Sequence, residues 1–360
     1  MYEYSHHLGL SSRGSLLTTC KEHQSTPSRD ESDAAEAPRT RDSENGQQEI
    51  SNDSLNMAHL ELIVHFSFDI YVPEFDQHIK EPATKLVLQT ALKAPFLMHE
   101  ILAISACHLS VTRPSDAAIY RSQAVQLQTK AIELFNMSTR DADRDNICAR
   151  LLFSSILGRH IIADALDSHG LDFSSFLQRY VQGIRIYRGV RAVAAEEDWN
   201  VLLGSELGPL MIRGLGIATY DQPYELEDTL WHLVFHATGL NDEEKASCET
   251  ALRLIETGFA NLRDLTRSET GRRMIFLWSI MLPDLFIELL ARQVPEAIAI
   301  LGRYAILLHY GRSLWQVGDA GPRLLHTIQR LLGPAWDPWL SWPEGLRNPI
   351  VLPVEGIHFA

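Results

Sequence analysis

Cysteine is scarce and widely spaced in this sequence. The 360 residues contain four cysteines, Cys20, Cys107, Cys148 and Cys248, and no two of them form a C-x2-C pair. Such spacing is typical neither of a disulfide-rich secreted domain nor of a structural zinc site. We therefore expect a protein of a reducing compartment that binds no metal.

Basic residues are also few. Lys and Arg number 32 against 46 Asp and Glu, which gives a net charge of −14 at pH 7. Because binding to nucleic-acid phosphates needs a basic face, we expect no DNA-binding residue and no direct sequence-specific binding of DNA.

Long apolar runs are missing as well. A membrane-spanning helix needs about 18 consecutive apolar residues, and the nearest run, Met274 to Leu290, contains Pro283, Asp284 and Glu288. The N-terminus has an acid at Glu3 and no long apolar stretch, so it does not read as a signal peptide. We expect a soluble intracellular protein without a membrane partner.

Enzyme motifs are incomplete. The segment Gly204 to Gly208 reads G-S-E-L-G, which has the wrong register for a nucleophile elbow. Gly214 to Gly216 lacks the preceding strand and the third glycine of a nucleotide-binding loop. His232 and His236 stand four apart on an expected helix, but zinc needs four ligands and only two are in view. We therefore expect no enzyme, no catalytic residue and no cofactor.

What the chain has is apolar periodicity at helical spacing. It is 45% hydrophobic, which is enough for a sizeable core, and no alternating strand pattern persists with turn signals beside it. We expect an all-α fold: one bundle of about ten helices over residues 57–345, with a C-terminal tail at 346–360. Residues 1–56 carry ten acids and five bases, and they should form a disordered acidic tail.

Prolines and capping residues mark the expected helix ends. Pro95 should open an apolar helix that ends before Arg113-Pro114, and Pro283 should bend the helix Met274 to Ala291. Asn241 with Glu244 has the spacing of a capping box.

The helix that begins at Pro95 carries two histidines and a cysteine. His99 and His108 are nine residues apart, so they face opposite sides and cannot form one site. We expect each to be hydrogen-bonded in a helical core, and Cys107 to be an inert, small apolar residue.

The C-terminal part has the densest pattern. Pro295 opens a periodic run to Leu308, and a second run, Leu324 to Leu332, ends at Gly333-Pro334. Trp336, Trp339 and Trp342 then stand between prolines. This segment is expected to be irregular and to form a bulky aromatic plug.

Three blocks in this order resemble the regulatory region of fungal zinc-cluster transcription regulators, in the branch similar to sterol uptake control proteins. The blocks are P-F-L-M-H-E-I-L-A-I-S-A-C-H-L-S at Pro95 to Ser110, the weaker helix Tyr120 to Phe135, and the C-terminal blocks from Pro295 to Pro343, which include W-x-P-W-L-x-W-P. The six-cysteine zinc cluster of that family has no counterpart here, so its DNA-reading residues cannot be carried over.

The resemblance implies a nuclear regulator of transcription, with shuttling to the cytoplasm left open. In that family the helical domain is similar to a sterol sensor that controls activation. It would act on a metabolic or biosynthetic gene set, secondary metabolism included, through a DNA-binding partner or as a homodimer. Two alternatives stay open: a truncated gene model of a complete zinc-cluster factor, and a helical small-molecule-binding protein or enzyme unrelated to transcription.

The apolar surplus of Met274 to Leu290 and of Ile298 to His309 predicts an apolar ligand pocket between these helices. Plain core burial would explain the same pattern. The predicted ligand-binding residues are Phe276, Trp278, Met281, Tyr304, Leu307, His309 and Trp315. Substituting Ala305→Trp should fill the pocket and leave the fold largely intact.

Overall fold

The computed structural model describes residues 56–70, 77–138, 147–167, 170, 172–192, 204–206, 208, 229–263 and 268–341. The chain divides into two units, Met1–Asn56 and Met57–Ala360. The predicted disordered tail and the predicted C-terminal tail lie outside the described residues, as does most of the glycine-rich stretch from Gly204 to Pro223.

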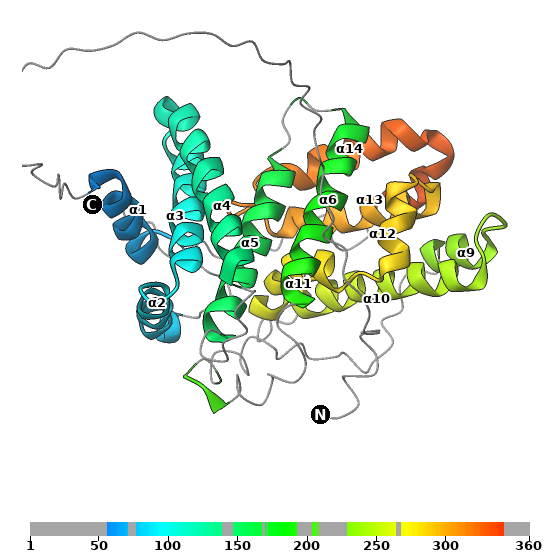
Figure 1. Ribbon diagram of the computed structural model, residues 1–360. Helices are drawn as coiled ribbons and strands as arrows, with labels where there is room; N and C mark the ends of the chain where they lie inside the picture. The colour runs from blue at the N-terminus through cyan, green and yellow to red at the C-terminus, as the bar shows by residue number, and fades with distance from the viewer. Residues whose placement is uncertain are drawn as a thin grey trace, which may run out of the picture. The chain divides into compact units, whose positions relative to one another are not determined.

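The described part of the second unit is helical and contains no strand, which confirms the all-α prediction (Figure 1). Its elements are α1 Met57–Phe68, α2 Gln77–Ala91, α3 Pro95–Thr112, η2 Pro114–Asp116, α4 Ala117–Ser138, α5 Ile147–Leu166, α6 Phe173–Ala192, α9 Thr229–His236, α10 Asp242–Arg263, α11 Ser268–Met281, α12 Asp284–Ala291, α13 Pro295–Tyr310, α14 Ala320–Leu332, η5 Pro334–Trp336 and α15 Asp337–Leu340.

Local signals set the helix ends where the sequence predicts them. Pro95 and Pro295 open α3 and α13, and α3 ends just before Arg113-Pro114. A proline suits the first turn because its missing N–H has no partner there in any case. Around Pro283 the chain turns by 90° between Met274–Met281 and α12, so the predicted bend is a full break that divides one expected helix into two.

The predicted capping box at the start of α10 forms. The Glu244 N–H donates to Asn241 Oδ1 at 2.9 Å, and the Asn241 N–H donates to Glu244 Oε2 at 3.0 Å. Two backbone donors that the helix leaves without partners are thereby satisfied.

Helices α1 to α5 pack around α3. Figure 1 shows α3, α4 and α5 side by side, and α3 also contacts α1 and α2. Their apolar faces form adjacent clusters, in which Phe96, Phe135 and Phe153 meet ring against ring. This packing explains why α3 is apolar almost all round: it has the length and composition of a membrane span, yet 67% of its residues are buried.

The larger core cluster lies farther along the chain. It runs from the end of α5 through α6 and α9 to α15, and it surrounds α13, along which residues 297–302 and 304–308 are all buried. Helix α13 contacts α10, α11, α12, α14 and α15. An apolar helix is stable in such a position because neighbouring helices cover it on every side.

The tryptophan segment differs from its prediction. Trp336 ends the short helix η5, and residues 337–340 form one further helical turn, α15. Prolines stand at the start of both turns, where the helix tolerates them. Trp336 and Trp339 are only partly buried against the core, so they do not form a buried plug; Trp342 lies outside the described residues.

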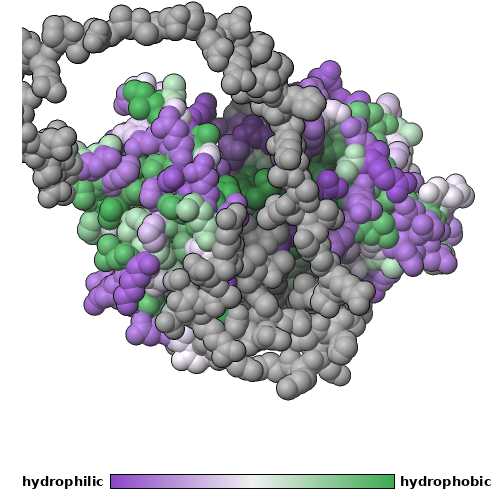
Figure 2. All heavy atoms as spheres, viewed as in Figure 1, coloured by the Kyte–Doolittle hydropathy of each residue, from purple (hydrophilic) through white to green (hydrophobic). Residues whose placement is uncertain are grey.

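Several large apolar side chains remain exposed on α1 and α4. Figure 2 shows hydrophobic surface on the side of the view where Figure 1 places α1 and α3. The exposed residues include Met57, Leu60, Val64 and Phe68 on α1, and Ile119, Val125 and Met137 on α4.

Candidate functional site

The predicted ligand-binding residues fall into different surroundings. Phe276, Trp278, Tyr304 and Leu307 lie in the larger core cluster, where Trp278 and Tyr304 stack with ring centroids 4.0 Å apart. Met281 is half-buried at the end of α11, and His309 is half-buried near the end of α13. Trp315 packs against the α1–α5 clusters instead. The structure thus brings four of the seven residues together and places Trp315 elsewhere.

A row of buried hydroxyl groups crosses this core. Tyr180 and Ser279 lie 2.6 Å apart (Oη to Oγ), Ser279 Oγ is 3.4 Å from the Tyr304 hydroxyl, and Tyr304 donates to the Ile275 carbonyl. The Trp278 indole donates to the Ala251 carbonyl. Burial raises the pKa of both tyrosines. These side chains are satisfied by one another, so they rigidify the core as it stands.

Trp315 packs against a second row of polar side chains, which consists of Asp69, His65 and His108. His65 Nδ1 lies 2.8 Å from Asp69 Oδ2, and His65 Nε2 lies 2.9 Å from His108 Nδ1. The His108 ring packs on the Trp315 indole with centroids 4.8 Å apart. The Asp69 carboxylate can only accept, so His65 carries its proton on Nδ1 and accepts at Nε2 from His108 Nδ1–H.

The surroundings of His65 and His108 favour the uncharged form of both imidazoles. Burial and then His65 lower the pKa of His108 to about 4. Burial also lowers the pKa of His65, although Asp69 opposes it. His99, by contrast, is half-buried and bonds the Pro95 carbonyl of its own helix at 2.8 Å, so only His108 fits the prediction of a histidine satisfied in the core.

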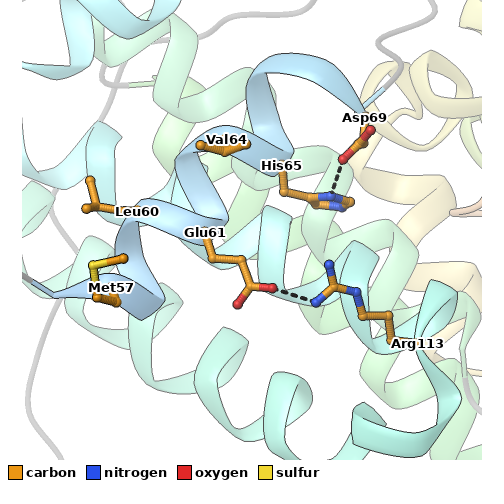
Figure 3. A pocket seen from close by; sticks show the side chains of 7 residues that line it. All are labelled: Met57, Leu60, Glu61, Val64, His65, Asp69 and Arg113. Atoms are coloured by element: carbon orange, nitrogen blue, oxygen red, sulfur yellow. Dashed lines mark hydrogen bonds and ion pairs between the residues drawn. The ribbon is translucent and has the colours of Figure 1, made fainter.

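An open pocket of about 310 Å³ adjoins His65 (Figure 3). Its lining residues are Met57, Leu60, Glu61, Val64, His65, Asp69 and Arg113. Figure 3 shows the two interactions that border it, Glu61 with Arg113 and His65 with Asp69.

Sequence reasoning overlooked this pocket. His65 and Asp69 stand four residues apart, a spacing that places them on one helix face and could have indicated their pairing. The partner His108 lies 43 positions farther along the chain, and no local pattern announces that contact.

A third polar group is buried between α3 and α5. Glu100 Oε1 accepts from His160 Nδ1 at 2.9 Å, and both side chains are almost fully shielded from solvent. Burial alone would lower the pKa of His160, but Glu100 and the Cys107 thiol outweigh it and raise the pKa to about 10. Cys107 packs half-buried against an apolar cluster, as expected of a small apolar residue, and the His160 imidazole is a polar neighbour that the sequence does not indicate.

The two histidines considered as metal ligands lie on α9. The rings of His232 and His236 stack in parallel with centroids 5.6 Å apart. Within the part of the chain that the structure describes, no group of three or more His, Cys, Asp or Glu side chains could hold a metal ion.

Comparison with known proteins points to one family. Residues 64–156 match the family model described as the fungal specific transcription factor domain. The match runs from the middle of α1 into α5, so it includes His65, Asp69, Glu100, His108 and Arg113. No curated protein matches the chain. The match supports a fungal transcription-factor regulatory domain, with a general role in transcription regulation; it covers roughly a quarter of the chain and leaves the branch of the family undefined.

Proposed function

We propose that the helical domain of this chain controls transcription of a metabolic or biosynthetic gene set by responding to a bound partner. The family match at residues 64–156 carries this proposal, because that segment contains most of the pocket beside His65. A transcription-factor domain implies action in the nucleus, and the matched family is not typically enzymatic.

The chemistry of the α1 surface supports a protein partner. Met57, Val64 and Phe68 are exposed by 70%, 57% and 73%, and Leu60 lies between them. Their spacings of three, four and four put them along one side of the helix, which is the usual form of a helix-docking face. The ion pair of Glu61 with Arg113 borders this apolar side and would set the orientation of a partner, such as a DNA-binding regulator.

A reporter assay tests the proposal. The full chain is fused to an unrelated DNA-binding domain whose sites stand upstream of a reporter gene in a fungal host. We expect reporter output to change relative to the DNA-binding domain alone, and the sign of the change separates activation from repression. Unchanged output at equal protein level would contradict a transcriptional role.

Matched variants tie the effect to α1. Val64→Glu places a charge on the proposed docking side, while Val125→Glu places the same charge on α4, where the valine is 61% exposed. We expect Val64→Glu to remove the reporter response and Val125→Glu to preserve it. Equal reporter responses from the two variants would show that the α1 surface is not the docking site.

An apolar small-molecule ligand is the second candidate. The apolar helices α11 and α13 support it, but the Tyr180, Ser279 and Tyr304 hydroxyls already bond one another, so a ligand hydroxyl would have to compete with those bonds. Such a ligand would have to displace the stacked Trp278 and Tyr304 rings. Thermal-shift titration with sterols tests this idea, with Ser279→Ala expected to weaken any stabilisation. A melting temperature that no sterol raises would refute it.

The structure changes which variant can serve in that experiment. Ala305 is fully buried on α13, and a Cβ at Gly321 would lie only 2.6 Å from its carbonyl oxygen, so α14 approaches closely here. A tryptophan at position 305 has no room, and Ala305→Trp should disrupt the fold instead of filling a pocket.

A further inference from the structure

A second pocket lies at the opposite end of the chain from the matched segment. It has a volume of about 540 Å³. Its lining residues are His232, Leu233, His236, Ala237 and Thr238 from α9 and the turn after it, Glu296 from α13, and Trp336 and Trp339 from the last two helical turns. Because it lies outside residues 64–156, nothing argued for it depends on the proposed function.

Two indole rings form one wall. Trp336 and Trp339 are arranged edge to face, with centroids 5.7 Å apart and planes inclined by 61°. Both pack against the larger core cluster while remaining partly exposed, so their positions are fixed by the fold. Indole rings have the strongest attraction for cations among the aromatic side chains.

The charge at the pocket is negative. Glu296 is half-buried, and it forms no hydrogen bond or ion pair with another described residue, although it stands in the first turn of α13. The C-terminal end of α9 also borders the pocket, but there the Lys245 ammonium already donates to the Phe235 carbonyl at 3.1 Å, so the negative charge of the lining comes from the Glu296 carboxylate. After burial itself, the charges of Glu296 and then Glu244 help to raise the pKa of nearby Cys248 to about 12, which is consistent with this negative field.

From the two indoles and the unpaired carboxylate we infer that this pocket binds a small quaternary ammonium compound. A guanidinium brings five N–H donors and a primary ammonium three, and each donor that loses water needs an acceptor. The lining offers Glu296 as its one carboxylate, with the Thr238 hydroxyl and the His232 and His236 rings as its other side-chain acceptors. A quaternary ammonium has no donor to satisfy, is weakly hydrated, and gains from the indole faces and from Glu296 together.

Isothermal titration of the full chain with choline tests this inference, because choline has an uncharged counterpart of the same shape. In 3,3-dimethyl-1-butanol a carbon replaces the charged nitrogen. We expect choline to bind and the alcohol to bind about tenfold more weakly or not at all, the difference expected from one cation–π and charge contribution. Equal affinities, or no heat with choline, would overturn the inference.

Variants place the binding in this pocket. Glu296→Gln keeps the shape of the side chain and removes its charge, and we expect it to weaken choline binding about tenfold. Glu288→Gln makes the same change at an exposed position of α12, outside the pocket, and should leave binding unchanged. Identical binding by these two variants would show that Glu296 has no role and would overturn the inference.

The indole wall is tested in the same way. Trp336→Leu should abolish choline binding, and Trp336→Phe should retain part of it because a weaker aromatic face remains. Indole N–H signals in nuclear magnetic resonance spectra provide a second measurement: choline should shift those of Trp336 and Trp339 and leave that of buried Trp278 in place. Shifts confined to other tryptophans would contradict the assigned site, even if a leucine variant failed to fold.

Discussion

At the scale of single residues, two opposing effects act on the charged forms of the buried pair Glu100 and His160. Burial penalises both charges, whereas their 2.9 Å contact favours them. Replacing such a pair by apolar side chains can be nearly neutral, but removing one member leaves a buried charge without compensation. Replacing one of the two residues should therefore lower the free energy of unfolding more than replacing both.

The first prediction follows from this asymmetry. Glu100→Leu should lower the free energy of unfolding by about 3–5 kcal/mol, because the His160 charge loses its partner. The double variant Glu100→Leu with His160→Leu should cost clearly less than the sum of the two single variants. Urea denaturation of all four proteins measures this coupling. Additive single effects would show that the pair contributes no interaction of its own.

The second prediction concerns acid stability. The pKa of His108 is lowered to about 4 in the folded chain, against an ordinary value of 6.5, by burial and then by His65. The folded state therefore binds fewer protons than the unfolded state between these values, so stability is intact above pH 6.5 and falls as the pH drops toward 4. His108 alone should account for a loss of about 3 kcal/mol, since each pKa unit corresponds to about 1.4 kcal/mol.

Denaturation at a series of pH values, with His108→Asn as the comparison, measures this loss. The variant should be less stable at neutral pH and show a shallower decline in acid. Asp69, Glu61 and Arg113 around His65 are the same in both proteins, so their titration largely cancels in the difference. Parallel pH profiles would contradict the assignment to His108.

For single residues, the sequence indicates that a polar side chain such as His108 is buried, but not which side chains it contacts. His108 was correctly expected to be hydrogen-bonded in a core, because its helix is apolar almost all round. Its partners could not be named, since His65 and Trp315 approach it only after distant helices have packed. The same holds for His160, which stands 60 positions from Glu100. Trp315 was grouped with Tyr304 from nearness in sequence, and the fold separates them.

At the scale of elements, the contact between α13 and α14 depends on a glycine. A Cβ on Gly321 would lie 2.6 Å from the Ala305 carbonyl oxygen and 2.7 Å from the His309 amide nitrogen. Both are backbone atoms of a buried helix and cannot rotate aside. Any larger residue must move one helix away from the other.

The third prediction is therefore that Gly321→Ala destabilises the protein, although alanine is the better helix former. Overpacking of this kind costs about 1–3 kcal/mol, which exceeds the gain of about 1 kcal/mol in helix propensity. Gly239→Ala is the matched control, because nothing lies within 4 Å of a Cβ at that position. Thermal unfolding should separate the two variants; equal melting temperatures would mean that α14 can shift freely.

Element boundaries were predicted well wherever one or two residues determine them. Pro95, Pro295 and the Asn241–Glu244 box act on the backbone beside them, so their effect is visible in the sequence. The segment from Trp336 onward was misjudged because its prolines were taken as helix breakers, whereas they stand in first turns. The pocket that these tryptophans line also needs α9 and Glu296, which no local pattern connects to them.

At the scale of the whole molecule, the distribution of charge decides what the chain can bind. The net charge is −14, and many cationic side chains are already engaged. Seven arginines of the described residues each pair with a carboxylate: Arg113, Arg121, Arg179, Arg188, Arg253, Arg292 and Arg323. Arginines held in this way would have to give up their partners before they could bind phosphates.

The fourth prediction is that the purified 360-residue chain does not bind duplex DNA specifically. Binding to DNA gains free energy when cationic side chains displace counterions from the phosphates, and here seven arginines would first have to break an existing ion pair. Fluorescence anisotropy with labelled duplexes at physiological salt should show weak binding that lowering the salt strengthens. An added DNA-binding regulator should bring the chain to DNA, and Val64→Glu should prevent this while Val125→Glu should not. Nanomolar, sequence-specific binding by the chain alone would contradict this prediction. It would mean that residues outside the described part contact the bases, and that the chain recognises DNA without a DNA-binding partner.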